Sequence, residues 1–540
     1  MNHALLALLA ACAPAFAAEP PASNDWWHDA VFYEVFVRSF ADSTSGPLAG
    51  DGVGDIPGLI ERLDELNDGQ PGGDDLGVTA LWLMPIAQSP SYHGYDVVDY
   101  YNVDDEYGTN ADFERLVDEC HKRGMKVIVD LVLNHCSSEN PWFIEAKNPD
   151  SPRHDWFVWR DTRPDWKNNL HMWHSLGDDG KGPYYYGFFW KGMPDLNYDN
   201  KLVSLTAYDI SRHWLADLHA DGFRLDAIRY LFERGENIDS CQETIDWLTD
   251  WHKYIRTVEP ACFTVGEVWG QTDFVKQYVP KAIDSVFEFQ LAETIVAGVN
   301  SGDPKAVAAQ ITHLMDSYDG APYSTFLTNH DQNRLMSQLG GPNAEAIAKN
   351  KLAATLLLTL PGTPFLYYGE EIGMTGVKPD EDIRTPMQWT PDPMQSGFTT
   401  GKPWRQVNDN TADINVAAEK KDADSLWSHY QSLIELRLGT EALRRGTAEV
   451  VETNIDGLLI YRRQLPRQEL LVLANFTDRP IGEFGIDLDG LRPNRLIRSR
   501  VLFGDARSRS GHADKDGWLH DWQPVAEIGP REAVVVRVIR

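Results

Sequence analysis

The stretch KVIVDLVLNH, residues 126–135, decides the fold. It is a mostly apolar run rich in Val, Ile and Leu, as expected for a strand that is buried on both faces of a parallel sheet. Before it lies a stretch in which apolar residues recur three or four positions apart, which indicates an amphipathic helix. These apolar positions are Phe113, Leu116, Val117 and Cys120. The two stretches together predict one unit of a fold in which helices cover parallel strands.

Seven other runs along the chain have the same character, and amphipathic helical stretches alternate with them. Together with the first, the runs span residues 31–40, 79–85, 126–135, 221–227, 263–269, 285–289, 323–330 and 364–371. Eight such units, each a strand followed by a helix, are typical of a (β/α)8 barrel, the TIM barrel of the α/β class. We therefore predict this barrel as the main body of the protein.

Two regions depart from the alternation. Residues 136–200, after the third strand, are rich in Trp, Tyr, Pro and Asn and predict an inserted small domain. After a helical stretch at 426–438, alternating strands separated by Gly and Pro predict a C-terminal antiparallel β domain. The predicted parts are a signal peptide at 1–18, a first barrel part at 19–135, an inserted B domain at 136–200, a second barrel part at 201–440 and a C-terminal β domain at 441–540.

The charge and the hydropathy of the chain exclude some partners. The 540 residues include 49 Lys and Arg against 81 Asp and Glu, a net charge of −32. A surface this acidic repels nucleic-acid phosphates, so we expect no nucleic-acid partner and a neutral or cationic ligand instead. Beyond the N-terminus no stretch reaches the roughly 20 apolar residues of a membrane-spanning helix, which predicts no transmembrane segment. We expect a monomer.

The N-terminus has the pattern of an export signal. Residues 4–11 are apolar, and Ala15-Phe16-Ala17 matches a signal-peptidase site, so we expect a secreted or periplasmic protein. The alternative is a lipoprotein anchored through Cys12, because residues 9–12 resemble a lipobox. Four cysteines would remain after cleavage, enough for up to two disulfides whose pairing the spacing does not reveal. They are Cys120, Cys136, Cys241 and Cys262.

Three carboxylates stand at the ends of predicted strands: Asp226, Glu267 and Asp331. In a barrel of this kind the C-terminal ends of the strands form the active site, so these side chains should meet on one face. Two carboxylates about 5 Å apart suit retaining hydrolysis of a glycosidic bond, in which one attacks the anomeric carbon and the other protonates the leaving oxygen. The sequence therefore predicts a glycoside hydrolase.

The neighbours of these carboxylates predict different roles. Arg224 lies two residues before Asp226 on the same strand face and should lower its pKa, which favours Asp226 as the nucleophile. Glu267 lies among apolar residues whose desolvation should raise its pKa, which favours it as the acid and later the base. Asp331 would orient sugar hydroxyls and stabilise the positive charge of the transition state.

These strand ends, in their order and spacing, resemble the conserved segments of the α-amylase family of glycoside hydrolases, from about Trp26 to the C-terminus. SYHGYD at 91–96, MPDLN at 193–197 and GTPFLYYGEE at 362–371 resemble further segments of the family. The resemblance implies Asp226 as nucleophile, Glu267 as acid and base, and Asp331 as stabiliser of the transition state. It implies substrate contacts from Tyr95, Asp96, His135, Arg224, His330 and Arg384. No organic cofactor is expected. Because all three carboxylates are present, a non-catalytic binding relative is disfavoured.

The subtype signals point in two directions. The inserted segment, with DWFVW at 155–159 and YYYG at 184–187, resembles bacterial α-amylases of the group intermediate between oligo-1,6-glucosidases and neopullulanases. Asp96 and Arg384 resemble a pair that binds the terminal glucose in exo-acting α-glucosidases. We favour an α-amylase that cleaves α-1,4-glucosidic bonds of starch, maltodextrins and malto-oligosaccharides. The alternative is an exo-acting α-glucosidase, an oligo-1,6-glucosidase or a glucosyl-transferring enzyme with the same catalytic residues.

A calcium site is a further prediction from the resemblance. Asp51 to Asp55 read DGVGD, similar to the end of a calcium loop in the family, with oxygen ligands at alternate positions, although residues 44–50 look like an insertion after Asp42. The alternative for this segment is an ordinary Gly-rich loop. Asn134 matches an Asn that binds calcium in many α-amylases, but Arg229-Tyr230 replaces the Lys-His pair that supplies another ligand. The predicted Ca²⁺ ligands are Asp42, Asp51, Asp55 and Asn134.

Overall fold

The computed structural model describes residues 25–166, 170–177, 180–239 and 241–539. The predicted signal peptide and Cys12 lie outside these residues. Eight strands, each paired in parallel with its neighbours, form one sheet in the order β11-β10-β9-β5-β2-β1-β13-β12. A parallel bridge between Phe287 and Ser324 joins the two ends of this sheet, so the barrel is closed and the predicted fold class is confirmed. The strands are β1 (Phe32–Val35), β2 (Ala80–Leu83), β5 (Lys126–Leu131), β9 (Gly222–Leu225), β10 (Phe263–Gly266), β11 (Ser285–Val286), β12 (Ser324–Thr325) and β13 (Thr363–Tyr367).

The strands end earlier than the apolar runs in the sequence suggest. The run at 31–40 continues beyond β1 into the short helix α1 (Val37–Phe40), and the run at 323–330 keeps only two residues of strand. In both cases the chain leaves the sheet after a few buried residues, and the following residues form loops at the C-terminal ends of the strands. These loops carry the polar residues of the predicted site.

Aromatic side chains fill part of the barrel interior. Phe32 of β1 stacks on Phe365 of β13 at a centroid distance of 4.3 Å, and Trp82, Phe263 and Phe287 belong to the same buried cluster. Bulky inward-facing side chains pack the barrel as a solid core, so a ligand has access only to the ends of the strands.

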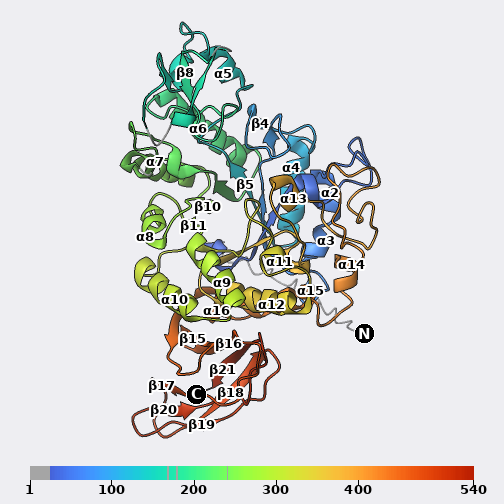
Figure 1. The fold of residues 1–540 in the computed structure, drawn as a ribbon, viewed down its shortest axis with the longest axis vertical. Coiled ribbons are helices and arrows are strands. Elements are labelled where there is room, and N and C mark those ends of the chain that lie inside the picture. The colour runs from blue at the N-terminus through green and yellow to red at the C-terminus, as the bar shows by residue number, and fades with distance from the viewer. Residues whose placement is uncertain (1–24, 167–169, 178–179, 240, 540) are drawn as a thin grey trace, which may run out of the picture.

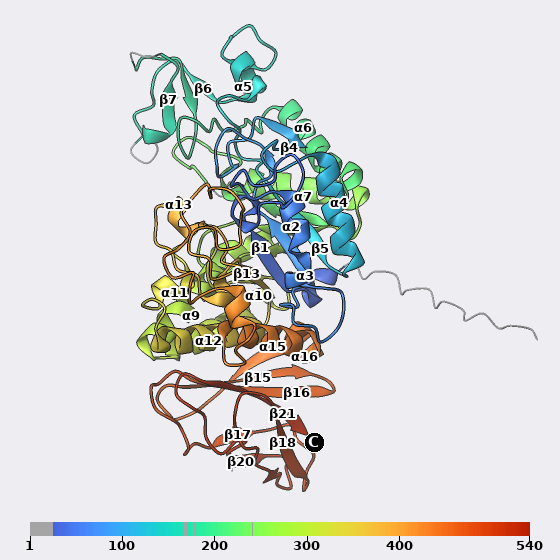
Figure 2. The same cartoon turned by 90° about the vertical axis from the view of Figure 1, so that its right-hand side faces the viewer.

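Helices surround the barrel (Figures 1 and 2). The helix α4 illustrates why they form: Thr109 and Asp112 make a reciprocal capping box at its start, and its apolar residues at helical spacing are buried as predicted. The longer helices are α4 (Asn110–Lys122), α6 (Lys201–Arg212), α7 (Gln242–Val258), α9 (Phe289–Ser301), α10 (Lys305–Tyr318), α12 (Ala344–Thr359) and α15 (Leu426–Leu438). The shorter ones include α2 (Ile56–Glu61), α3 (Leu63–Leu66), α8 (Thr272–Val275), α11 (Leu335–Gln338), α13 (Asp380–Ile383), α14 (Val416–Glu419) and α16 (Glu441–Arg445).

The segment after β5 leaves the barrel and forms a small antiparallel sheet at the top of Figure 1. It contains α5 (Pro141–Ala146), β6 (Trp159–Arg160), β7 (Trp173–Ser175) and β8 (Tyr184–Tyr186). Its end is tied to the barrel, because Leu196 donates its backbone N–H to the carbonyl of Asn134 at 2.9 Å. A short hairpin that the sequence analysis did not predict, β3 (Ala87–Gln88) and β4 (Asp99–Val103), follows β2.

The C-terminal residues form a separate antiparallel sheet at the opposite end of the molecule from β6–β8 (Figures 1 and 2). Its order is β14-β15-β16-β21-β18-β19, with β17 and β20 paired beside it. The strands are β14 (Thr447–Val451), β15 (Leu458–Leu465), β16 (Gln468–Asn475), β17 (Ile486–Leu488), β18 (Leu496–Phe503), β19 (Gly511–His512), β20 (Leu519–Trp522) and β21 (Ala533–Ile539).

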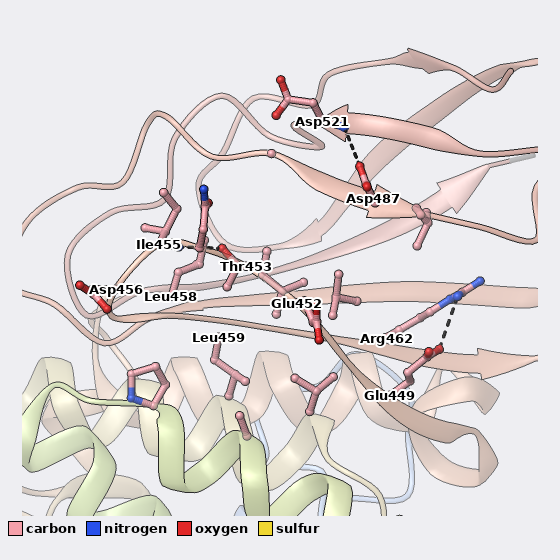
Figure 3. A pocket seen from close by; sticks show the side chains of 18 of the residues that line it. Glu449, Glu452, Thr453, Ile455, Asp456, Leu458, Leu459, Arg462, Asp487 and Asp521 are labelled. Carbon is pink, nitrogen blue, oxygen red and sulfur yellow. Dashed lines mark hydrogen bonds and ion pairs between the residues drawn. The ribbon is translucent and has the colours of Figure 1, made fainter.

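A groove of about 1160 Å³ lies between the start of α10 and the C-terminal sheet (Figure 3). Its lining includes six acidic residues against two basic ones, Lys305 and Arg462. Glu449, Glu452, Asp456, Asp487 and Asp521 are the acidic residues labelled in Figure 3. No predicted site residue lines this groove.

The four cysteines predicted to remain in the mature chain are buried and carry free thiols, so none of them forms a disulfide. The prediction left up to two bridges open, and this structure contains neither. Among the described residues, no helix has both the length and the apolar character needed to cross a bilayer.

Candidate active site

One arginine joins the carboxylates at the C-terminal ends of β5, β9 and β10. Nη1 of Arg224 donates to both oxygens of Asp130 at 2.8 Å and to Oδ1 of Asp226 at 2.8 Å, while Nη2 donates to Oε2 of Glu267 at 2.9 Å. The Arg224 side chain is 1% exposed and that of Asp130 is fully buried. A buried charge needs such partners, because leaving one charge unpaired there costs several kcal/mol.

The parallel register explains why these residues meet. Arg224 of β9 lies opposite Asp130 of β5 on one side and opposite Val265 of β10 on the other. Asp226 and Glu267 are each the first residue after their strand. Ala227, in a left-handed conformation at φ 50°, turns the chain so that its N–H donates to Oε2 of Glu267 at 3.1 Å. Asp226 and Glu267 therefore lie on one face, as predicted.

Burial dominates the charge state of the two carboxylates bound to the arginine. It raises the pKa of Asp226 to about 7 and that of Glu267 to about 7, although Arg224 lowers both. The expectation that Arg224 holds the pKa of Asp226 low is therefore wrong: the guanidinium serves both side chains, and desolvation outweighs it. Their interaction with Arg224 does not distinguish a nucleophile from an acid.

Asp331 differs from the other two carboxylates. It is 33% exposed, and Arg384 donates from Nη2 to its Oδ1 at 2.9 Å. Burial would raise its pKa, but His330 and Arg384 together lower it, so Asp331 is anionic near neutral pH. Its charge raises the pKa of both Asp226 and Glu267, and the three carboxylates thus share one electrostatic site.

Three of the predicted substrate-binding residues, Tyr95, His330 and Arg384, contact this group. Tyr95 has its hydroxyl 2.6 Å from Nε2 of His330 and donates to Asp130 at 3.1 Å. Arg384 donates from Nε to the carbonyl of His330 at 2.9 Å. His135, at the end of the third strand run, is 1% exposed, and its backbone forms an antiparallel β-bridge with that of Asp195 in the inserted segment. Burial lowers the pKa of His135 to about 3, so this imidazole is neutral.

Asp96 is buried and is held by serines of its own loop. Its Oδ1 accepts from the hydroxyl of Ser89 at 2.8 Å and also from Ser91. Arg384, its predicted partner in binding a terminal glucose, donates instead to Asp331 and, at 3.3 Å, to Asp380. Each member of the predicted pair is thus fixed by other partners.

The predicted calcium ligands face protein donors. Asp42 accepts from the N–H of Gly50 at 2.8 Å and of Gly52 at 2.9 Å. Asp55 caps α2 and accepts from the N–H of Gly58 at 2.7 Å and the hydroxyl of Ser43 at 2.8 Å. A carboxylate bound to N–H groups offers fewer lone pairs to a cation.

The other two predicted ligands differ from each other. Asp51 accepts from the N–H of Val53 at 2.8 Å. Asn134 donates from Nδ2 to Asp195 at 3.2 Å, while its Oδ1 is buried and accepts no hydrogen bond from the described residues. Among the described residues, no three His, Cys, Asp or Glu side chains come together in a way that could hold a metal ion. Asp42 and Asp55 bind protein donors while Asn134 keeps a free oxygen, and the calcium ion stays a prediction from the sequence.

Sequence reasoning did not single out Asp130 or Glu34 as functional residues. Asp130 binds Arg224 through both oxygens, and Glu34 of β1 has Oε1 2.6 Å from Nδ1 of His330. A signal was present in the sequence, because each is a carboxylate inside an otherwise apolar strand run. A charge at such a position requires a buried partner.

Comparison with known proteins agrees with this geometry. The family model described as "Alpha amylase, catalytic domain" matches residues 34–446. Alpha-amylase 3 of Dictyoglomus thermophilum is 39% identical over 459 residues, which cover 84% of this chain and 86% of that protein. Oligo-1,6-glucosidase of Halalkalibacterium halodurans is 32% identical over 538 residues, with 85% and 91% covered.

Solved structures show the same relationship. The crystal structure of an α-amylase from H. orenii superimposes with a TM-score of 0.79 at 37% identity, and the match covers 94% of this chain and 99% of that one. The family model extends over the barrel and all three carboxylates that end its strands. The chain therefore belongs to the α-amylase family and is a glycoside hydrolase that acts on α-glucans.

Proposed function

We propose that the protein hydrolyses α-1,4-glucosidic bonds of starch, maltodextrins and related α-glucans with retention of configuration, through a covalent glucosyl-enzyme. The observation that carries this proposal is that Asp226 and Glu267 bind the two terminal nitrogens of one guanidinium, at 2.8 and 2.9 Å. Both carboxyl groups thus lie at one guanidinium, which is compatible with the separation of about 5 Å in retaining enzymes. Inverting enzymes need a wider gap for a water molecule.

The proposed roles follow the family. The Asp226 carboxylate attacks the anomeric carbon while the Glu267 carboxylic acid gives its proton to the leaving glycosidic oxygen. Glu267 then takes a proton from water, the water oxygen attacks the same carbon, and Asp226 leaves as a carboxylate. Asp331, which keeps its negative charge, favours the positive charge that develops on the sugar ring.

The shared environment of the two carboxylates sets an expected pH dependence. The reaction needs Asp226 ionised and Glu267 protonated, and burial raises both pKa values to about 7. Such a pair titrates as a unit, and its productive form carries one proton. Below the productive range Asp226 becomes protonated, and above it Glu267 loses its proton. The plot of kcat/KM against pH should therefore be bell-shaped, with its maximum at about pH 7.

The α-amylase subtype is supported by the relatives named α-amylase at 39% and 37% identity. The second candidate is exo-acting cleavage, supported by the relative named oligo-1,6-glucosidase and by Asp96 and Arg384, which are 5% and 2% exposed. An aspartate and an arginine fixed in this way offer an acceptor and a donor for the hydroxyls of a terminal sugar. The two candidates differ in the length of glucan that they accept.

A time course on soluble starch, maltose and p-nitrophenyl α-glucoside tests both. An α-amylase should remove the iodine staining of starch rapidly and release maltose and longer products. If glucose is released from the two short substrates while starch stays almost unchanged, the enzyme is instead an exo-acting α-glucosidase. Proton NMR of the first products should show the α-anomer, and a β-anomer would refute retention. The variant Asp226→Asn should remove nearly all turnover while the circular dichroism spectrum stays unchanged. A high concentration of acceptor sugar separates hydrolysis from glucosyl transfer.

We also propose export, with cleavage after Ala17 or Ala18, on the pattern of residues 1–18. N-terminal sequencing of protein recovered from the medium or periplasm tests it. A diacylated N-terminal Cys12 in the membrane fraction would support the lipoprotein alternative instead.

A further inference from the structure

Glu34 is a buried carboxyl that the reaction above does not use. It lies on β1, is 2% exposed, and places Oε1 2.6 Å from Nδ1 of His330. From there a chain of short contacts leads to the catalytic group: Nε2 of His330 is 2.6 Å from the Tyr95 hydroxyl, which is 3.1 Å from Oδ2 of Asp130. Asp130 in turn binds Arg224. These contacts therefore connect Glu34 to the catalytic carboxylates.

The Tyr95 hydroxyl has one proton to donate and two lone pairs that accept hydrogen bonds. Its oxygen faces Asp130, His330 and, at 3.3 Å, Nη1 of Arg224. Asp130 pairs with Arg224 and only accepts, and the guanidinium only donates. The Tyr95 proton therefore points to Asp130, and Nε2 of His330 has to donate to the Tyr95 oxygen.

The position of Asp331 is a second, independent reason to place a proton on Nε2 of His330. Its Oδ2 lies 3.4 Å from Nε2 of His330. Because an unprotonated Nε2 would turn its lone pair toward this carboxylate as well as toward Tyr95, two oxygen atoms favour a proton on that nitrogen. His330 therefore carries Nε2–H.

One proton remains for the 2.6 Å contact between Glu34 and Nδ1 of His330. It belongs either to His330, giving a buried ion pair, or to Glu34, giving two neutral groups. Both residues are at most 2% exposed, and two buried charges cost more solvation than one hydrogen bond between them returns. Burial raises the pKa of Glu34 well above its usual value and lowers that of His330 well below its own.

The surrounding charges do not reverse this preference. The titratable and charged groups that act on Glu34 include His330, Asp331, Asp130, Arg224 and Tyr367, and a hydrogen bond from the His330 backbone lowers its pKa less than burial raises it. The cation among them, Arg224, already serves three carboxylates. A further negative charge on Glu34 would add to the repulsion from Asp130 and Asp331.

We propose that Glu34 is a positioning residue whose protonated carboxyl donates its O–H to Nδ1 of His330 and so fixes His330 in the Nε2–H tautomer. That tautomer keeps the Tyr95 hydroxyl on Asp130, and Asp130 on the arginine that binds Asp226 and Glu267. The inference rests on the glycoside hydrolase activity of the family and is independent of the subtype proposed above.

Two variants of similar size test it. Glu34→Gln keeps a neutral donor, because an amide N–H can take the place of the carboxyl O–H. Glu34→Met fills the space and removes the donor. We expect kcat/KM of Glu34→Gln to stay within about threefold of the wild type, and that of Glu34→Met to fall at least about tenfold, with substrate KM changed little. The substrate is the one of the panel above that the wild-type enzyme turns over fastest.

A spectroscopic measurement makes the test independent of activity. The infrared difference spectrum of wild type minus Glu34→Gln at pH 7 should contain the C=O stretch of a protonated carboxyl that shifts in D2O. Carboxylate bands in its place would overturn the proposal, since Glu34 would then be ionised. Equal loss of activity in both variants, with native circular dichroism and Tm, would also overturn it. An inactive wild type would instead contradict the assigned hydrolase activity and leave the infrared test standing.

Discussion

The substitution Arg224→Lys tests the central arginine while it keeps the positive charge. The guanidinium donates from two nitrogens, Nη1 to Asp130 and Asp226 and Nη2 to Glu267, at 2.8 to 2.9 Å. A lysine ammonium has three donors on a single nitrogen and cannot reach both sides of this arrangement. We expect the bonds to Glu267 and to one of the other carboxylates to be lost.

The magnitude follows from the bonds lost. Hydrogen bonds to charged groups contribute about 1.5 to 3 kcal/mol each. Two of them at the lower value give about 3 kcal/mol, and since about 1.4 kcal/mol corresponds to a factor of ten, kcat/KM should fall by about two orders of magnitude. The loss should appear mainly in kcat, because the arginine orients the reacting carboxylates and its guanidinium lies beneath them at 1% exposure.

Initial rates on a chromogenic malto-oligosaccharide, with circular dichroism and Tm to confirm folding, measure this effect. Arg115→Lys is the matched control: Arg115 is 53% exposed and pairs with Asp112 one helical turn away, a contact worth little in water. The control should keep full activity. A folded Arg224→Lys enzyme whose kcat/KM stays within about fivefold of the wild type would refute the reasoning, because catalysis would then not need the two-nitrogen geometry of the guanidinium.

Asp130→Asn removes a negative charge that raises the pKa of Asp226, so the acid limb of the kcat/KM profile should move to lower pH by up to about one unit; a shift to higher pH would contradict this. Gly54→Ala brings a Cβ to 2.1 Å from the Val37 carbonyl oxygen, whereas in the control Gly482→Ala the new Cβ has its nearest atom at 3.4 Å. Thermal unfolding should therefore show that the free energy of unfolding falls by about 2 kcal/mol or more in Gly54→Ala and not in the control. Dialysis against EDTA should leave Tm unchanged, because Asp42 and Asp55 bind protein donors; a fall in Tm that Ca²⁺ reverses would instead support the predicted calcium site.

The sequence allowed the barrel and the grouping of its carboxylates to be predicted, for a physical reason. A strand buried on both faces must be apolar, so the apolar runs at 126–135 and 221–227 can be recognised as strands. The parallel register then places the residues that follow these strands on one face of the barrel. Asp226 and Glu267 meet at Arg224 because of this register, together with the turn at Ala227.

Contacts between distant segments could not be predicted in this way. His330 and Glu34 are 296 positions apart in the chain, yet lie 2.6 Å from each other. Periodicity describes which face a residue is on, but not which residue of a distant segment it contacts. For the same reason Asp96 and Arg384 could be recognised as a pair only by resemblance, and in the structure each has other partners.

The charge states show where local reasoning about the sequence fails most clearly. An arginine two positions before an aspartate suggests a lowered pKa, but the pKa depends on how much solvent is lost and on how many carboxylates share the cation. Here Arg224 serves three carboxylates, and burial raises the pKa of both Asp226 and Glu267 to about 7. The raised pKa values therefore do not by themselves separate the proposed nucleophile from the proposed acid. In the proposed mechanism the roles also depend on which carboxyl faces the anomeric carbon and which faces the leaving oxygen when substrate binds.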